Sequence, residues 1–158
     1  MLPGYGHQKL TNINRLKPYF EENNIWCVGN REYDSNYVKP ILESEINYFD
    51  LKTLRNKGID SCISGFHQMV NSHKLNGFFI HLDVDVLNDN IMPAVDSRQV
   101  DGLNYSEFTD LMVRLLSSPK AIGIEITILD PRLDPEGKYT SDFIKKLLNA
   151  INIAQNQK

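Results

Sequence analysis

Three side chains that can bind a metal ion alternate along residues 81–85, whose sequence is HLDVD. Side chains two residues apart in a β-strand point to the same face, so a strand here would bring His81, Asp83 and Asp85 together. Two carboxylates inside an otherwise apolar strand are costly to remove from water unless a positive charge compensates them. This spacing therefore indicates either a metal site or a pair of aspartates that is salt-bridged or partly exposed at the end of the strand.

The residues around the acidic pair favour a metal ion as the compensating charge. No Lys or Arg occurs between Lys74 and Arg98, although a more distant basic residue could still reach the aspartates. Oxygen ligands alone favour a hard cation such as Mg²⁺ or Mn²⁺, and a nearby imidazole shifts the preference toward Mn²⁺ or Zn²⁺. A phosphotransferase of the haloacid dehalogenase type also carries an Asp-x-Asp in this context. It requires a Thr soon after the second Asp, where this chain has Val86 and Leu87.

Apolar runs that alternate with helical stripes predict the elements that would position these residues. Short runs rich in β-branched or aromatic residues predict strands over residues 25–28, 46–49, 77–86 and 121–129. Apolar residues at helical spacing predict helices within residues 10–20, 37–42, 62–70, 104–115 and 143–151. This alternation is typical of a three-layer αβα fold with a mostly parallel sheet, in which ligands bind beyond the carboxyl ends of the strands.

The segment that follows the acidic strand is long and lacks a periodic pattern. It runs over 17 residues from Leu87 to Leu103, and structureless segments of that length in compact domains tend to be functional or disordered. Asn104 and Glu107 then form the pattern of a capping box, which predicts that a helix begins at this point. A loop that leaves the end of the acidic strand would lie where an active site is expected.

Length, charge and cysteine content limit the class of protein. We expect a single α/β domain over residues 1–158, because a chain of this length can bury its own core. A net charge of −3 provides no basic surface for nucleic acid or an anionic membrane, and no apolar run reaches the length of a membrane span. Cys27 and Cys62 lack a CxxC spacing and are expected to be free thiols in a reducing compartment, which indicates a cytoplasmic protein.

Three ordered segments within residues 25–135 resemble the arginase, agmatinase and formimidoylglutamase family. The acidic strand, the loop sequence MPAVD over residues 92–96 and the turn DGL over residues 101–103 resemble the family's C-terminal metal motif. Residues 27–34 (CVGNREYD) resemble its Gly-x-Arg-Asp-x-Asp element, and residues 123–135 resemble its last sheet strand. The resemblance implies an arginase-like α/β domain that corresponds to the C-terminal half of the family's fold.

The resemblance also implies a chemistry and a substrate class. Members of the family use two Mn²⁺ ions, roughly 3.5–4 Å apart, to activate a water that attacks a small guanidino or amidino compound. By this resemblance Asp83 and Asp85 would be metal ligands, and His81 would either hydrogen-bond a ligand carboxylate or be a satisfied core histidine. Asp34 matches a position near the amino end of the substrate, but an N-cap for a helix starting near Asn36 explains it equally well.

The sequence also departs from the family's pattern. The two motifs that supply the other metal ligands, Gly-Gly-Asp-His and Asp-Ala-His-x-Asp, are absent from the 158 residues. Ile128 occupies the position at which relatives have the glutamate that binds the guanidinium group. Glu125 lies on the same strand but on the opposite face, so it could replace that glutamate only through a bulge, and we otherwise expect it to support the site from outside the metal ligands.

These departures leave two functions open. The chain could belong to a binuclear-manganese hydrolase that cleaves a C–N bond, in which case we expect it to bind one Mn²⁺ or none by itself. It could instead be a non-catalytic arginase-like interaction or assembly domain, whose aspartates are neutralised by protein cations. The sequence identifies no catalytic residue in either case. A half-sheet with an exposed apolar edge strand is also expected to pair with a second copy, as a homo-oligomer, or to aggregate.

Overall fold

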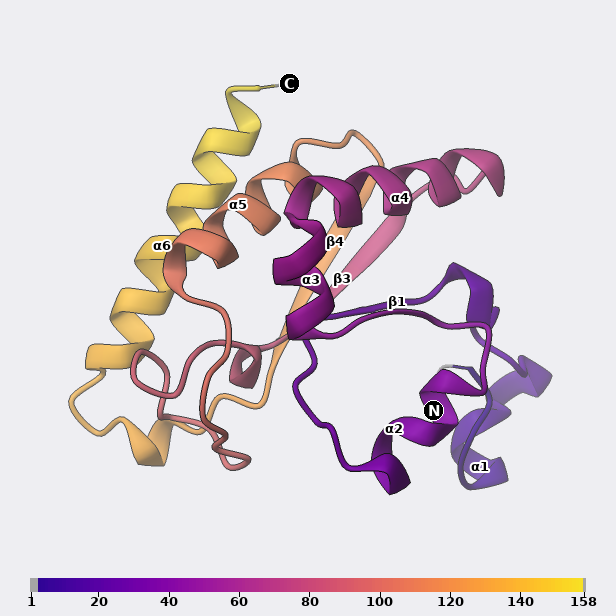
Figure 1. Ribbon diagram of the computed structural model, residues 1–158, viewed down its shortest axis with the longest axis horizontal. Helices are drawn as coiled ribbons and strands as arrows, with labels where there is room; N and C mark the ends of the chain where they lie inside the picture. Colours follow the sequence, from indigo (N-terminus) through magenta and orange to yellow (C-terminus); the bar gives the residue numbers. More distant parts are fainter. Residues whose placement is uncertain (1–2, 158) are drawn as a thin grey trace. The chain divides into compact units, whose positions relative to one another are not determined.

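The computed structural model describes residues 3–157 (Figure 1). The chain divides into two compact units, of which one ends at Lys52 and the other begins at Thr53. Each unit contains its own pair of parallel β-strands. The single domain expected over residues 1–158 stays a prediction.

The first unit is built from short elements. They are α1 (Gln8–Thr11), the 3₁₀ turns η1 (Ile13–Arg15) and η2 (Glu22–Asn24), β1 (Trp26–Val28), α2 (Ser35–Leu42) and β2 (Asn47–Phe49). β1 and β2 pair in parallel, and the rings of Trp26 and Phe49 stack with their centroids 5.3 Å apart. The helix predicted within residues 10–20 does not form as one element. α1 ends at Thr11, and Asn14 and Arg15 adopt positive φ angles, which a right-handed helix cannot accommodate.

The second unit contains the longer helices. Its elements are α3 (Leu51–Lys57, which begins just before the boundary), α4 (Ile59–Ser72), β3 (Phe78–Asp83), η3 (Val84–Val86), α5 (Tyr105–Leu116), β4 (Ala121–Thr127), η4 (Pro131–Leu133) and α6 (Lys138–Gln155). β3 and β4 pair in parallel, and their register is regular from Phe79 opposite Gly123 to Asp83 opposite Thr127. Helices that alternate with parallel strands confirm the predicted α/β class.

Two features of this unit differ from the expectations. The strand predicted over residues 77–86 ends at Asp83, and the chain continues as the 3₁₀ turn η3. Helix α3 carries too weak a pattern to be recognised, because its seven residues include two apolar side chains, Leu51 and Leu54. Both of these leucines are nevertheless buried. A short helix can therefore be held by tertiary packing although its sequence shows no apolar stripe.

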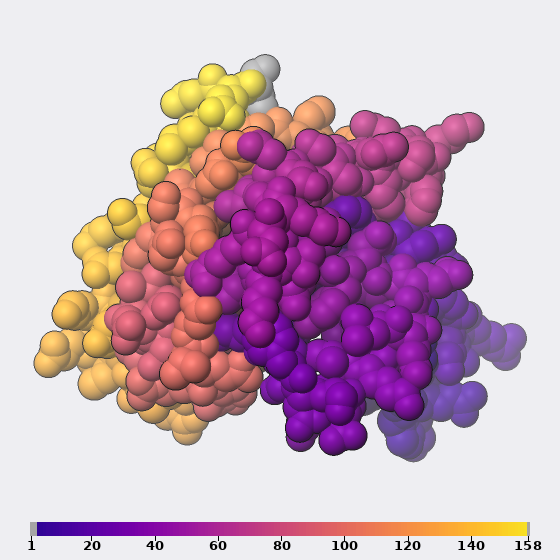
Figure 2. All heavy atoms as spheres, viewed as in Figure 1, coloured from indigo at the N-terminus to yellow at the C-terminus, as the bar shows by residue number. Residues whose placement is uncertain are grey.

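The core of the second unit includes the interface between α5 and α6, and Figure 2 shows the atoms of α6, in yellow, lying along those of α5. Phe108 and Met112 of α5 are buried, as are Phe143 and Leu147 of α6. The rings of Phe108 and Phe143 lie 5.8 Å apart in a tilted arrangement. Both helices thus bury the apolar stripe that their sequences predict.

Removing a ring from this interface should destabilise the second unit. Phe143 is 1% exposed, so Phe143→Ala should lower the free energy of unfolding by about 3–5 kcal/mol, which includes the cost of the cavity. Leu148→Ala on the same helix is the matched control, because Leu148 is 53% exposed and its truncation should cost no more than about 0.5 kcal/mol. Urea unfolding measures both values, and equal losses in the two variants would contradict this assignment of the core.

Candidate functional site

The acidic strand is buried on one face and open on the other. Phe78, Ile80 and Leu82 of β3 are buried, whereas Phe79 and His81 are exposed. Asp83 follows the exposed side, and its side chain is 46% exposed. Its carboxylate therefore remains partly hydrated, so it needs less compensating positive charge than a fully buried carboxylate would.

Four polar side chains meet on the open face of β3 and β4. The parallel register places His81 opposite Glu125 and Asp83 opposite Thr127. Nδ1 of His81 lies 2.9 Å from Oε2 of Glu125, and its Nε2 lies 3.2 Å from Oδ1 of Asp83. The hydroxyl of Thr127 donates a hydrogen bond to the same oxygen of Asp83. The imidazole is thus held between two carboxylates, and Asp83 is held by two neighbours.

Part of this arrangement follows from the sequence. Of the two explanations that the sequence left open for His81, a contact with a carboxylate is the one present: its ring contacts Asp83, and Glu125 joins it from the neighbouring strand. Thr127 was not foreseen, although its position two residues after Glu125 places it on the same face of a strand. The sequence does not give the register of β3 against β4, and that register decides which residue of β4 lies opposite Asp83.

Asp85 lies beyond the end of the strand. Residues Val84–Val86 form the turn η3, which is closed by a hydrogen bond of 3.2 Å from the amide of Leu87 to the carbonyl of Val84. Asp83 and Asp85 therefore both lie at the carboxyl end of β3, as the fold class predicts. The two-residue alternation that would align them on one face stops at Asp83, so their common orientation does not follow from strand geometry.

The donor atoms suit Mn²⁺ in chemistry but not in number. Carboxylate oxygens with an imidazole nearby are ligands that Mn²⁺ accepts, usually in a set of about six. Within residues 3–157, no group of three or more His, Cys, Asp or Glu side chains is arranged to hold a metal ion. His81 and Thr127 already contact Asp83. The part of the chain that the structure describes therefore does not complete a metal site by itself.

Glu125 does not take the place of the glutamate that the family resemblance implies at position 128. The register between β3 and β4 shifts at Phe78 and Phe79 but is regular beside Glu125, so no bulge turns this side chain toward the end of the sheet. Ile128 has a φ of 73°, an unusual conformation for a β-branched residue, and the regular strand has ended one residue before it. Glu125 therefore contacts His81, and the backbone changes direction at Ile128.

Asp34 caps a helix of the first unit. Its side chain accepts a hydrogen bond of 2.8 Å from the amide of Asn36, and α2 begins at Ser35. This contact confirms the N-cap that the sequence predicted as one explanation of Asp34. The proposed role near the amino end of a substrate stays a prediction.

The long segment after Asp85 is ordered by packing and by ion pairs. Met92, Ala94 and Val95 are buried, and Leu87 and Leu103 form an isolated parallel bridge that closes the segment. The guanidinium of Arg98 donates two hydrogen bonds, of 2.7 and 2.8 Å, to the carboxylate of Asp89. As expected, the segment contains no named helix or strand between η3 and α5.

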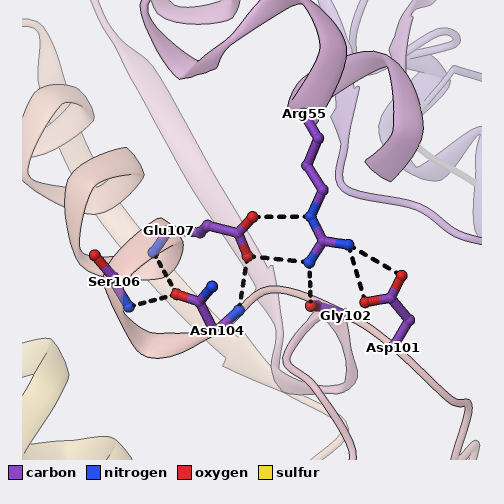
Figure 3. Close-up of polar contacts among 6 residues, drawn as sticks. All are labelled: Arg55, Asp101, Gly102, Asn104, Ser106 and Glu107. Carbon is purple, nitrogen blue, oxygen red and sulfur yellow. Dashed lines mark hydrogen bonds and ion pairs between the residues drawn. The ribbon is translucent and has the colours of Figure 1, made fainter.

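A second group of charged residues surrounds the end of this segment (Figure 3). Arg55 of α3 donates to both oxygens of Glu107, at 2.8 and 3.1 Å, and to both oxygens of Asp101, each at 3.0 Å. Glu107 also accepts from the amide of Asn104, which completes the predicted capping box of α5. The hydrogen bonds from Arg55 hold the pKa of Glu107 below its usual value, although partial burial opposes them.

Sequence comparisons show which proteins the chain is similar to. A model of the arginase family matches residues 6–153. The arginase of Bacillus subtilis (strain 168) is 26% identical over 148 residues, which cover 92% of this chain and 49% of that protein. The arginase of Plasmodium falciparum (isolate 3D7) is 28% identical over 141 residues, which cover 88% of this chain and 33% of that protein.

Solved structures show the same relationship at the level of the fold. The crystal structure of arginase from Bacillus subtilis subsp. subtilis str. 168 matches with a TM-score of 0.82 and 24% identity, over 94% of this chain and 50% of that one. The chain thus spans between about a third and a half of the length of these curated relatives, and half of the solved structure. These matches confirm the resemblance found in the sequence and the arginase-like fold.

Truncating the cap of α2 should destabilise the first unit. Asp34→Ala removes the acceptor for the Asn36 amide and should cost about 0.5–2 kcal/mol of stability. Asp34→Ser is the matched control, because a serine hydroxyl can cap the same amide and should restore most of the loss. Thermal unfolding followed by circular dichroism measures both variants. Equal stability of Asp34→Ala and the unmodified protein would contradict the capping role.

The contact between Arg55 and Glu107 should make stability depend on acidity. Because the pKa of Glu107 is lowered in the folded chain, its contribution is complete above the ordinary value of 4.5 and is lost as the pH falls through the folded value. The free energy of unfolding should therefore fall more steeply below about pH 4.5 in the unmodified protein than in Glu107→Gln. Urea unfolding from pH 7 to pH 3 gives the difference, and parallel profiles would contradict this assignment.

Proposed function

Because the chain belongs to the arginase family, we propose that it forms part of the active site of a hydrolase that cleaves a C–N bond in a small guanidino or amidino compound. The observation that carries the proposal is the acidic pair, Asp83 and Asp85, at the carboxyl end of β3 in a chain that the family model matches almost throughout. Ligands of parallel sheets bind at this end of the strands.

Asp83 and Asp85 are the proposed ligands of Mn²⁺ in this chain. A bound divalent ion would supply Lewis acidity and activate water for the hydrolysis. His81 and Thr127 would fix the carboxylate of Asp83, and Glu125 would fix the ring of His81. Since two carboxylates do not complete the coordination of an ion, hydrolysis would require further ligands, either from a longer polypeptide or from another chain.

Asp34 is the proposed contact for the amino end of the substrate. One of its oxygens accepts the hydrogen bond from the Asn36 amide. A carboxylate has two oxygens and about four acceptor sites, so capping α2 leaves capacity for an ammonium group. The negative charge that stabilises the first turn of α2 is also the charge that such a group requires.

A non-catalytic assembly domain is the second candidate function. Three observations favour it, of which the first two are that His81 and Thr127 already hold Asp83 and that an isoleucine occupies position 128. Two large apolar side chains of β4, Ile122 and Ile126, are also exposed to 71% and 43%. Exposed apolar side chains on a strand are suited to contact with another polypeptide or a second copy of the chain.

The cytoplasm is the proposed compartment. Within the described residues, Cys27 and Cys62 are not joined in a disulfide, and reduced cysteines are typical of a reducing compartment. Within residues 3–157, no helix is both long enough and apolar enough to cross a membrane.

Binding of Mn²⁺ separates the two candidate functions. Electron paramagnetic resonance of free Mn²⁺ at pH 7.5 should show binding by the unmodified chain and at least roughly tenfold weaker binding by Asp83→Asn/Asp85→Asn, because two anionic ligands are lost. Asp60→Asn/Asp110→Asn is the matched control, since it removes the same charge from two exposed aspartates that pair with Arg114. Equal binding by the unmodified chain and the Asp83/Asp85 variant would contradict the metal site and favour the assembly domain, whereas no binding by either would show that this chain forms no metal site by itself.

A further inference from the structure

Arg55 connects three segments of the second unit (Figure 3). Its guanidinium extends from α3 to the first turn of α5 through Glu107, and to the end of the long segment through Asp101. It also donates a hydrogen bond of 2.9 Å to the carbonyl of Gly102. One side chain therefore makes five hydrogen bonds to three residues. Nε and Nη2 donate to the two oxygens of Glu107, Nη1 donates to both oxygens of Asp101, and Nη2 also donates to the carbonyl of Gly102.

The turn that Arg55 contacts has an unusual backbone. Asp101 and Gly102 both adopt positive φ angles, 68° and 116°. A positive φ is uncommon for a residue with a side chain, although Asp adopts it more readily than most. Arg55 stabilises the turn further by binding both carboxylate oxygens of Asp101 and the carbonyl of the next residue. Charge-assisted hydrogen bonds therefore add to the conformational preference of the turn itself.

The same turn lies directly against the backbone that follows Asp85. A Cβ atom at Gly102 would lie 2.6 Å from the backbone of Leu87 and Asn88, so the two segments touch without room for a side chain. Leu103 donates a hydrogen bond of 2.9 Å to the carbonyl of Val86, and Asn88 donates one of 2.9 Å to the carbonyl of Leu103. These bonds fix the backbone of residues 86–88. Asp85 directly precedes this backbone, on the side of β3.

We propose that Arg55 is a positioning residue that fixes the turn η3, and with it Asp85, by holding the Asp101–Gly102 turn against residues 86–88. Its effect on a ligand ion rests on the proposed function, whereas its effect on the backbone does not. If Arg55 served only as an ion pair between helices, it would stabilise the unit without ordering residues 86–88. The two roles therefore predict different patterns of local order.

Amide hydrogen exchange distinguishes these patterns. In Arg55→Met, the amides of Asn88 and Leu103 should exchange at least about tenfold faster than in the unmodified protein, because their bonds depend on the turn. The amide of Phe78, at the start of β3, bonds at 2.8 Å to the carbonyl of Lys120, the residue before β4, and should keep its rate. Arg55→Lys, which retains the charge without the planar fork, should give intermediate rates at Asn88 and Leu103.

Arg114→Met is the matched control. The side chain of Arg114 is 39% exposed, like that of Arg55, and it also pairs with two carboxylates, those of Asp60 and Asp110. It links α4 and α5 away from the Asp101–Gly102 turn, so its loss should leave the exchange of Asn88 and Leu103 unchanged. Unchanged exchange at these amides in Arg55→Met, or equal acceleration at Phe78, would overturn the proposal.

Two further measurements keep the result decisive. Asp101→Asn removes the charged partner but keeps a residue that tolerates positive φ, so it should reproduce the faster exchange even if Arg55→Met folds poorly. Where the unmodified chain binds Mn²⁺, Arg55→Met should weaken that binding several-fold and Arg114→Met should not. If the unmodified chain binds no Mn²⁺, the proposed metal site fails, and the exchange rates still decide the role of Arg55.

Discussion

The parallel register of β3 against β4 determines which side chains meet at the candidate site. Because Asp83 lies opposite Thr127 and His81 opposite Glu125, four polar groups share one face of the sheet while Ile80 and Leu82 fill the other. A shift of one residue on β4 would replace Glu125 and Thr127 with isoleucines on this face. The polar cluster and the core behind it therefore depend on the same set of backbone hydrogen bonds.

Charge is balanced differently on the acidic strand and in the segment that follows it. Around Asp83, the neighbours are a histidine and a hydroxyl, which can donate hydrogen bonds without supplying a permanent positive charge. Around Asp89 and Asp101, by contrast, arginine guanidinium groups pair directly with the carboxylates. The loop is thus held by permanent cations, whereas the acidic strand retains the electrostatic demand that a metal ion could meet.

The similarity to arginases bears on whether a metal ion balances the charge of the acidic strand. The chain matches between about a third and a half of the length of these proteins and has the same fold over the matched part of the solved structure. An active site formed from several strand ends needs residues from several strands, so the proposed ligands Asp83 and Asp85 would need partners from other strands.

The sequence alone determined the features that depend on local pattern. Alternating apolar runs predicted the four strands and their parallel class, and the capping box predicted the start of α5, since caps and periodicity involve residues a few positions apart. Only the tertiary structure decided that the acidic strand ends at Asp83, that Thr127 reaches its carboxylate, and that Arg55 supports the turn beside Asp85. Arg55 and Asp101 are 46 positions apart in the chain. A contact of that kind is created by the packing of α3, whose own sequence carries little signal, so no local pattern in the sequence could predict it.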